Sequence, residues 1–96
     1  MGSYTHESCQ GTVVGVSCRG DGLSDKSAEL EIRFLHASSQ TAEGMHITAS
    51  AAPQAFAAFA TIAMLSYQHG LPLDIEIRRA PPETPVITCM RVKNKA

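Results

Sequence analysis

Aromatic residues and basic charge are scarce in this sequence. It has no Trp, and Phe and Tyr make up 5% of its 96 residues. Eight Lys and Arg against nine Asp and Glu leave a net charge of −1 at pH 7, with no basic surplus to neutralise phosphates. Proteins that bind single-stranded nucleic acid stack the bases on aromatic rings over a basic groove. We therefore expect no nucleic-acid partner.

The N-terminus lacks an apolar run. Its first ten residues, MGSYTHESCQ, contain no hydrophobic segment of the kind that a secretory signal peptide requires. We therefore expect a cytoplasmic protein, or a secreted one if a signal peptide has been removed. The most apolar stretch, Ala51–His69, is short and interrupted by polar residues, so we expect no membrane span.

Cysteine is present in an odd number, as Cys9, Cys18 and Cys89. This count fits a reduced cytoplasmic protein better than a disulfide-stapled secreted one, although one bridge plus one free thiol stays open. We expect Cys18 and Cys89 to be small buried residues of strands. No C-x-x-C or H-x-x-x-H spacing brings metal ligands together, so we expect no metal and no cofactor.

One long helix is predicted over Ala51–His69. Ser50 stands where an N-cap belongs, and Pro53 falls in the first turn, where its missing N–H costs little. Gly70 follows the last turn, where a left-handed residue is favoured, and Pro72 prevents the helix from restarting.

This helix has two apolar faces. The predicted core-facing stripe repeats every three or four positions and comprises Phe56, Phe59, Ala60, Ala63, Met64 and Tyr67. No Asp, Glu, Lys or Arg occurs between Glu43 and Asp74, and so short a chain cannot easily bury a helix on two sides. We therefore expect a homo-oligomer formed through the helix, with an interface of Ala55, Ala58, Phe59, Ile62 and Leu65. The alternative is an Ala-rich surface that needs no cover.

Alternation of apolar and polar residues predicts strands. The expected segments are Thr12–Cys18, Ala28–Leu35, Met45–Ala49, Leu71–Arg78 and Val86–Lys93. The residues expected to share an inward face in the three middle strands are Ala28, Leu30, Ile32, Phe34, Met45, Ile47, Ala49, Leu73, Ile75 and Ile77. Those expected to share a face in the outer two are Thr12, Val14, Val16 and Cys18, and Val86, Thr88, Met90 and Val92.

The resulting order is three strands, one helix and two strands. It predicts a mostly β, α+β chain: a five-stranded antiparallel barrel of the OB type, with the helix between strands three and four. An open α+β sheet with the helix across one face is the alternative. We expect residues 1–10 to form a flexible N-terminal segment and residues 11–96 to form a single OB-like domain.

Two short stretches resemble a known family. They are Cys9–Val13, CQGTV, at the opening of the first strand and Tyr67–Leu73, YQHGLPL, at the turn from helix to strand, which the alternating Asp74–Ile77 follows. Together with the element order, these resemble the B subunits of bacterial B-pentamer toxins of the Shiga and subtilase-cytotoxin kinds. The resemblance implies an OB fold and a ring of subunits whose helices pack around a central pore. It implies no glycan-binding residue, because no such motif aligns.

The function that we expect is a small, homo-oligomeric, non-catalytic binding or interaction module, similar to a toxin B subunit. Its small-molecule, glycan or protein ligand would bind at loops 19–27, 36–44 or 80–85, since loops on a rigid scaffold commonly carry function.

The alternative function is a small enzyme with a site between subunits. It would use His36 or His46 with Glu29 or Glu31 as acid and base. The two glutamates also fit an ordinary solvated strand face, which Arg33 continues.

Overall fold

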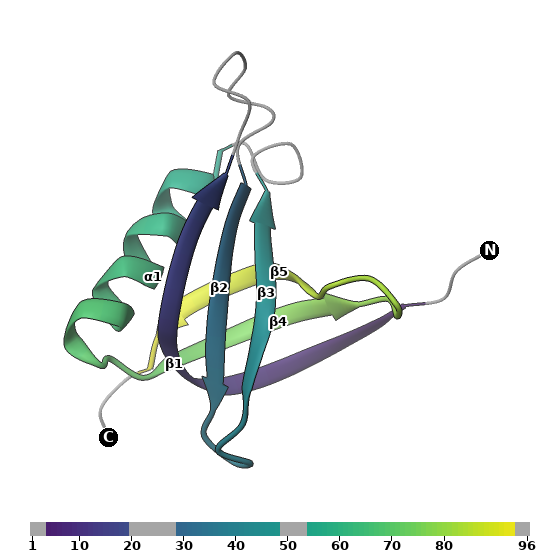
Figure 1. Cartoon of the computed structure of the whole chain (residues 1–96), viewed down its shortest axis with the longest axis horizontal. Helices are drawn as coiled ribbons and strands as arrows, with labels where there is room; N and C mark the ends of the chain where they lie inside the picture. The colour runs from purple at the N-terminus through teal and green to yellow at the C-terminus, as the bar shows by residue number, and fades with distance from the viewer. Residues whose placement is uncertain (1–3, 20–28, 49–53, 94–96) are drawn as a thin grey trace.

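The computed structural model describes residues 4–19, 29–48 and 54–93. It is mostly β with one helix. The elements in chain order are β1 (Thr5–Arg19), β2 (Glu29–His36), β3 (Ala42–Thr48), α1 (Phe56–His69), β4 (Leu73–Arg79) and β5 (Val86–Val92) (Figure 1). Within the described ranges, no helix combines the length and apolar character that a membrane crossing requires.

The strands form a closed barrel in the order β1-β2-β3-β5-β4. Four of the contacts are antiparallel, but β3 and β5 run parallel and pair at His46 and Val86. The prediction of an antiparallel barrel is therefore wrong at this contact. The barrel has an odd number of strands, so strand directions cannot alternate all the way around it and one contact must be parallel.

The first strand begins earlier than the sequence pattern indicates. Thr5–Gln10, expected to be flexible, pairs with β4, and Gly11–Arg19 pairs with β2. Figure 1 shows the consequence: β1 runs from the N-terminal end beneath β3 and β2, then turns upward beside β2. One long bent strand therefore serves two neighbours.

The core confirms the alternation predicted for the three middle strands. Two of the predicted inward residues, Ala28 and Ala49, lie outside the described residues. The other eight are all buried: Leu30, Ile32, Phe34, Met45, Ile47, Leu73, Ile75 and Ile77. Burial of such side chains contributes on the order of 2 kcal/mol each, so this layer is the main source of barrel stability.

A bulge in β1 breaks the alternation predicted there. Val13 lies opposite Phe34 and Gly15 lies opposite Arg33, which leaves Val14 as an extra residue. Val13 is buried and Val16 packs against the core, whereas Val14 is 46% exposed. The prediction that Val14 and Val16 share a face is wrong, because a bulge shifts the two-residue period by one.

A second bulge interrupts the two-residue alternation in β5. Glu76 lies opposite Cys89 and Ile77 lies opposite Ile87, so Thr88 is the extra residue. Ile87 and Met90 are buried, three positions apart. Met90 and Val92 share a face as predicted, since they lie opposite Ile75 and Leu73, whereas the bulge separates Val86 and Thr88 from that face.

The end of the helix confirms its predicted signal. Gly70 has φ of 66°, in the left-handed region, and its N–H donates to Ser66 O at 2.7 Å. The helix begins after Ala55, which makes no side-chain cap. The predicted N-cap and first-turn residues, Ser50 and Pro53, lie outside the described residues.

The helix is partly rotated from its predicted orientation. Of the predicted stripe, Ala63 is buried and Phe56, Phe59 and Ala60 pack against the core. Ser66 is also buried, while Met64 and Tyr67, which we expected in the core, are 37% and 50% exposed. Ser66 Oγ accepts from Val13 N–H at 3.0 Å and donates to Leu71 O at 2.7 Å. A buried hydroxyl with both partners satisfied is stable in a core, so this polar residue turns toward the barrel.

Gly11 lies where β1 passes from β4 to β2, and it provides a test of the fold. A Cβ at Gly11 would lie 2.0 Å from Leu35 O, whereas a Cβ at Gly44 would meet nothing within 4 Å. We expect Gly11→Ala to lower the free energy of unfolding by about 2 kcal/mol or more, because backbone must move to relieve the overlap. Urea denaturation would measure it. Gly44→Ala is the control, and equal stability of the two variants would contradict the assignment.

Candidate functional site

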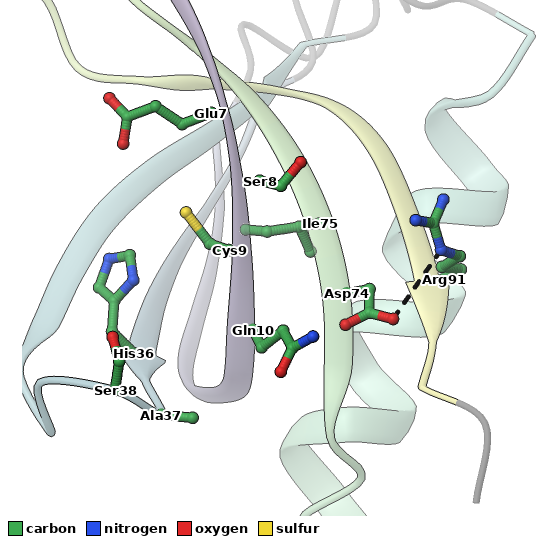
Figure 2. Close-up of a pocket in the computed structure, with 10 residues that line it drawn as sticks. All are labelled: Glu7, Ser8, Cys9, Gln10, His36, Ala37, Ser38, Asp74, Ile75 and Arg91. Carbon is green, nitrogen blue, oxygen red and sulfur yellow. Dashed lines mark ion pairs between the residues drawn. The ribbon is translucent and has the colours of Figure 1, made fainter. Parts of the chain in front are cut away.

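A groove of about 690 Å³ lies over the N-terminal half of β1. Its lining residues are Glu7, Ser8, Cys9, Gln10, His36, Ala37, Ser38, Asp74, Ile75 and Arg91. Figure 2 shows them on two sides of β1. Cys9 and His36 lie on one side, and Asp74 and Arg91 lie on the other.

Strand register brings these residues together. Gln10 lies opposite Asp74, and Asp74 in turn lies opposite Arg91, so three adjacent strands contribute one row across the sheet. Gly11 lies opposite His36, which places the turn after β2 beside β1. The groove therefore forms where β1 leaves β2 and the turn at residues 37–39 passes next to it.

A layer of charged residues lies at one end of the barrel interior. The inward alternation of four strands continues one step beyond the apolar core to Glu7, His36, Glu43 and Arg79. Arg79 is the last residue of β4, and Figure 1 shows this end of β4 on the side of the barrel away from α1. The layer thus covers the end of the core that the helix does not.

Arg79 is the centre of this layer. Its Nε donates to Glu7 Oε2 at 2.6 Å, and its Nη1 and Nη2 donate to Glu43 Oε2 and Oε1 at 2.5 and 3.0 Å. His36 Nε2 lies 2.9 Å from the same Glu43 Oε1. A planar guanidinium suits this two-pronged contact, so Arg79 joins β1, β3 and β4 through side chains.

The pKa values in this region follow from the contacts. The hydrogen bonds from Arg79 lower the pKa of Glu43 to about 2, and that from His36 acts in the same direction. Hydrogen bonds to Glu43 and Glu7 raise the pKa of Arg79. Burial raises the pKa of the Cys9 thiol, and the charge of Glu7 adds to this. Glu43 is therefore ionised and Cys9 a neutral thiol near pH 7.

Asp74 is the polar residue of the groove with spare bonding capacity. Its Oδ1 is buried and has no hydrogen-bond partner in the described part of the chain. Its Oδ2 lies 3.9 Å from Arg91 Nε, beyond hydrogen-bond distance, and Arg91 is equally far from Glu76. A buried acceptor without a donor costs free energy, and the 26% exposure of the whole side chain leaves the rest of this carboxylate open to the groove.

The histidine and glutamates named by the enzyme hypothesis meet elsewhere. His46 Nδ1 lies 2.5 Å from Glu29 Oε1, and its Nε2 lies 3.0 Å from Glu31 Oε2. These three residues belong to β2 and β3 and do not line the groove. His36 does line it, but its carboxylate partner is Glu43 rather than Glu29 or Glu31.

The predicted interface residues occupy one flank of α1. Leu65 is 39% exposed and Ala58 is exposed, whereas Phe59 and Ile62 pack partly against the core of their own chain. Ala55 precedes the helix and is half-buried. The exposed members leave an apolar flank that a second subunit could cover, and the interface itself stays a prediction.

The cysteines are free thiols and lie apart from any metal-binding cluster. Cys9, Cys18 and Cys89 are all unpaired. Cys18 is exposed, so its predicted burial is wrong. Over the described ranges, no group of three His, Cys, Asp or Glu residues is placed to hold a metal ion.

Sequence reasoning missed most of the residues at this site. Glu7 fell in the segment expected to be flexible, and Asp74 alternates with the inward residues Leu73 and Ile75, which places it on the outer face of the predicted strand. The inward position of Arg79 and Glu43 could have been predicted from the sequence. Arg79 lies two residues after Ile77 and Glu43 two residues before Met45, so both continue the alternation of inward-facing residues. Of the loops expected to bind a ligand, 36–44 contributes to the groove, 80–85 does not, and 19–27 lies largely outside the described residues.

Comparison with known proteins adds no relative. No protein-family model and no curated protein matches the chain.

The Glu43 contacts predict a pH dependence of stability. A carboxyl whose pKa is lower in the folded state binds fewer protons when folded, so its stabilising effect is complete above the unfolded pKa, near 4.5, and is lost as the pH falls toward 2. We expect the unfolding free energy to fall over this range by about 2 kcal/mol on this account, allowing for solvent screening. Denaturation at several pH values would measure it.

Glu43→Gln should flatten this pH dependence. Glu83→Gln, at an exposed turn, should keep the wild-type slope. A Glu43→Gln profile parallel to the wild type would show that the Arg79 contact is not what titrates.

Proposed function

We propose that this protein is a small, non-catalytic binding module of the OB type that assembles through its helix and holds its ligand in the β1 groove. The observation that carries the proposal is Asp74, whose buried oxygen lacks a donor on the wall of a groove that can hold a small molecule. Ligand pockets of several hundred Å³ with a few convergent polar groups are typical binding sites.

The strand order supports the OB type. A five-stranded Greek-key barrel with the helix between its third and fourth strands matches the order β1-β2-β3-β5-β4 and the parallel contact of β3 with β5. OB proteins that bind oligonucleotides use the face of strands two and three. The groove of this chain lies instead at β1 and the turn after β2, and its lining contains no Phe, Tyr or Trp.

The electrostatics favour binding over catalysis. A general acid or base works best with a pKa near the working pH, and that of Glu43 is about 2. A nucleophilic cysteine needs a lowered pKa, whereas that of Cys9 is raised. The His36–Glu43 contact resembles an oriented base, but its carboxylate is already committed to Arg79.

The resemblance to toxin B subunits supports assembly and suggests the first ligands to test. In such a ring, the uncharged flank of α1 would pack against a neighbouring subunit. Oligosaccharides are accordingly the first probes for the groove, followed by small polar fragments that carry a hydroxyl or amine donor for Asp74.

Two neighbouring serines test the groove. Ser38 lines it, whereas Ser39 lies on the same turn outside it. We expect a probe found on an oligosaccharide array or in an NMR fragment screen to lose at least about tenfold affinity with Ser38→Trp, because the indole fills the space, and to bind Ser39→Trp normally. Equal effects of the two variants, or no bound probe of either kind, would refute ligand binding in this groove.

Two neighbouring apolar residues test the assembly. Leu65 belongs to the predicted interface, and Met64, with almost the same exposure, points to another side of α1. We expect Leu65→Asp to yield a folded species of lower mass, because a buried unpaired charge disfavours the interface, while Met64→Asp keeps the wild-type mass. Light scattering on a sizing column would measure both. A monomeric wild type would show that the helix flank is an ordinary surface.

A further inference from the structure

We propose that the groove binds an extended, basic peptide segment of another protein, which adds as a strand to the free edge of β1. This rests on the proposed function and specifies the ligand class of the same groove. Strand addition of this kind obtains affinity from main-chain hydrogen bonds and specificity from side-chain contacts.

The free edge follows from the register of β1. Thr5–Gln10 pairs with β4 along one edge, whereas pairing with β2 along the other edge begins at Gly11. The last bond on that second edge runs from Ala37 N–H to Gln10 O at 2.8 Å. Before Gln10, therefore, β1 has a strand neighbour on one side only, as far as the described residues extend.

The backbone N–H and C=O groups on this free edge of β1 belong to Ser8. The N–H and C=O of Gln10 point toward the β2 side, and backbone groups of every second residue point to the same edge of a strand. Those of Ser8 consequently point to that side too. Among the described residues, no backbone group pairs with Ser8 there. An exposed edge of this kind is a template for another strand.

The groove runs along this edge. Glu7–Gln10, four consecutive residues, all line it. Successive side chains of a strand point to opposite faces, so a groove that touches all four must follow the strand and wrap over its edge. Figure 2 shows the turn that carries Ala37 and Ser38 beside this stretch of β1, which makes it the opposite wall. The site therefore suits an elongated guest.

The charge around the groove identifies the guest as basic. On one side, Glu7 and Glu43 share the guanidinium of Arg79, and His36 also contacts Glu43. On the other side, Asp74 and Glu76 are both near Arg91. With His36 counted as neutral, each cluster therefore carries one carboxylate in excess.

Lys93 offsets part of this charge, because it donates to the Gln10 side chain at 3.1 Å. A Lys or Arg of the guest is therefore expected beside Glu7 and Ser8 rather than at the Gln10 end, where complementary charge would also speed association.

The experiment uses a positional-scanning library of acetylated hexapeptide amides, screened against the whole chain by fluorescence polarisation. We expect the selected peptides to contain Lys or Arg, and Glu76→Gln, at the residue that lies opposite Ser8, to weaken their binding and reduce its salt dependence. Hydrogen exchange of the Ser8 amide should slow when a peptide binds. Selection of acidic or neutral peptides would overturn the charge argument.

Backbone methylation separates strand addition from side-chain binding. A selected peptide is made in two forms, N-methylated at alternate residues in one register or the other. We expect one form to lose at least about tenfold affinity, because its methyl groups replace the N–H donors that face β1, and the other form to bind normally. Equal binding of both forms would refute strand addition and leave the groove as a binding site.

Two further outcomes would also overturn the peptide proposal. If oligosaccharides or fragments occupy the groove and no library peptide does, the proposed function stands and strand addition is wrong. If the Ser8 amide is already protected in the oligomer without peptide, the edge pairs with a second copy of the chain.

Discussion

The absence of a side chain at Gly11 is the constraint on which the barrel depends. At this residue β1 ends its pairing with β4 and begins its pairing with β2, so Gly11 has Leu73 on one side and His36 on the other. The β2 backbone approaches so closely that Leu35 O would lie 2.0 Å from a Cβ at this position. The bend at this point lets one strand close the barrel, and it also opens the gap beside β1 in which the groove lies.

Much of the fold could be predicted from the sequence, because β2, β3 and β4 keep an unbroken two-residue period. The period failed where Val14 and Thr88 form bulges, since an extra residue is invisible to an alternation count. The helix was located correctly at its end by Gly70, but its rotation was not. Ser66 is not part of the stripe predicted to face the core, yet its hydroxyl lies there and satisfies a backbone N–H that the bulge in β1 leaves free of the ladder.

The candidate site was largely beyond prediction, for a reason that Arg79 illustrates. Its partners Glu7 and Glu43 lie 72 and 36 residues away in the chain, so no local spacing connects them. Extension of the inward series by one step would have placed Arg79 and Glu43 at one end of the barrel, with opposite charges, but not Glu7, which precedes the first strand that the sequence predicts. The open edge of β1 at Ser8 depended on where β2 ends, and a sequence pattern locates such boundaries poorly.

The parallel contact between β3 and β5 has a consequence for the behaviour of the protein at high concentration. The two strands pair at His46 and Val86, while each of the other strand contacts extends over many more residues. Separation at this contact would unroll the barrel into an open antiparallel sheet, with β3 and β5 as its edges and the apolar core on one face. Such a sheet is a template for intermolecular pairing. Resistance to aggregation therefore depends on the shortest row of hydrogen bonds in the barrel wall.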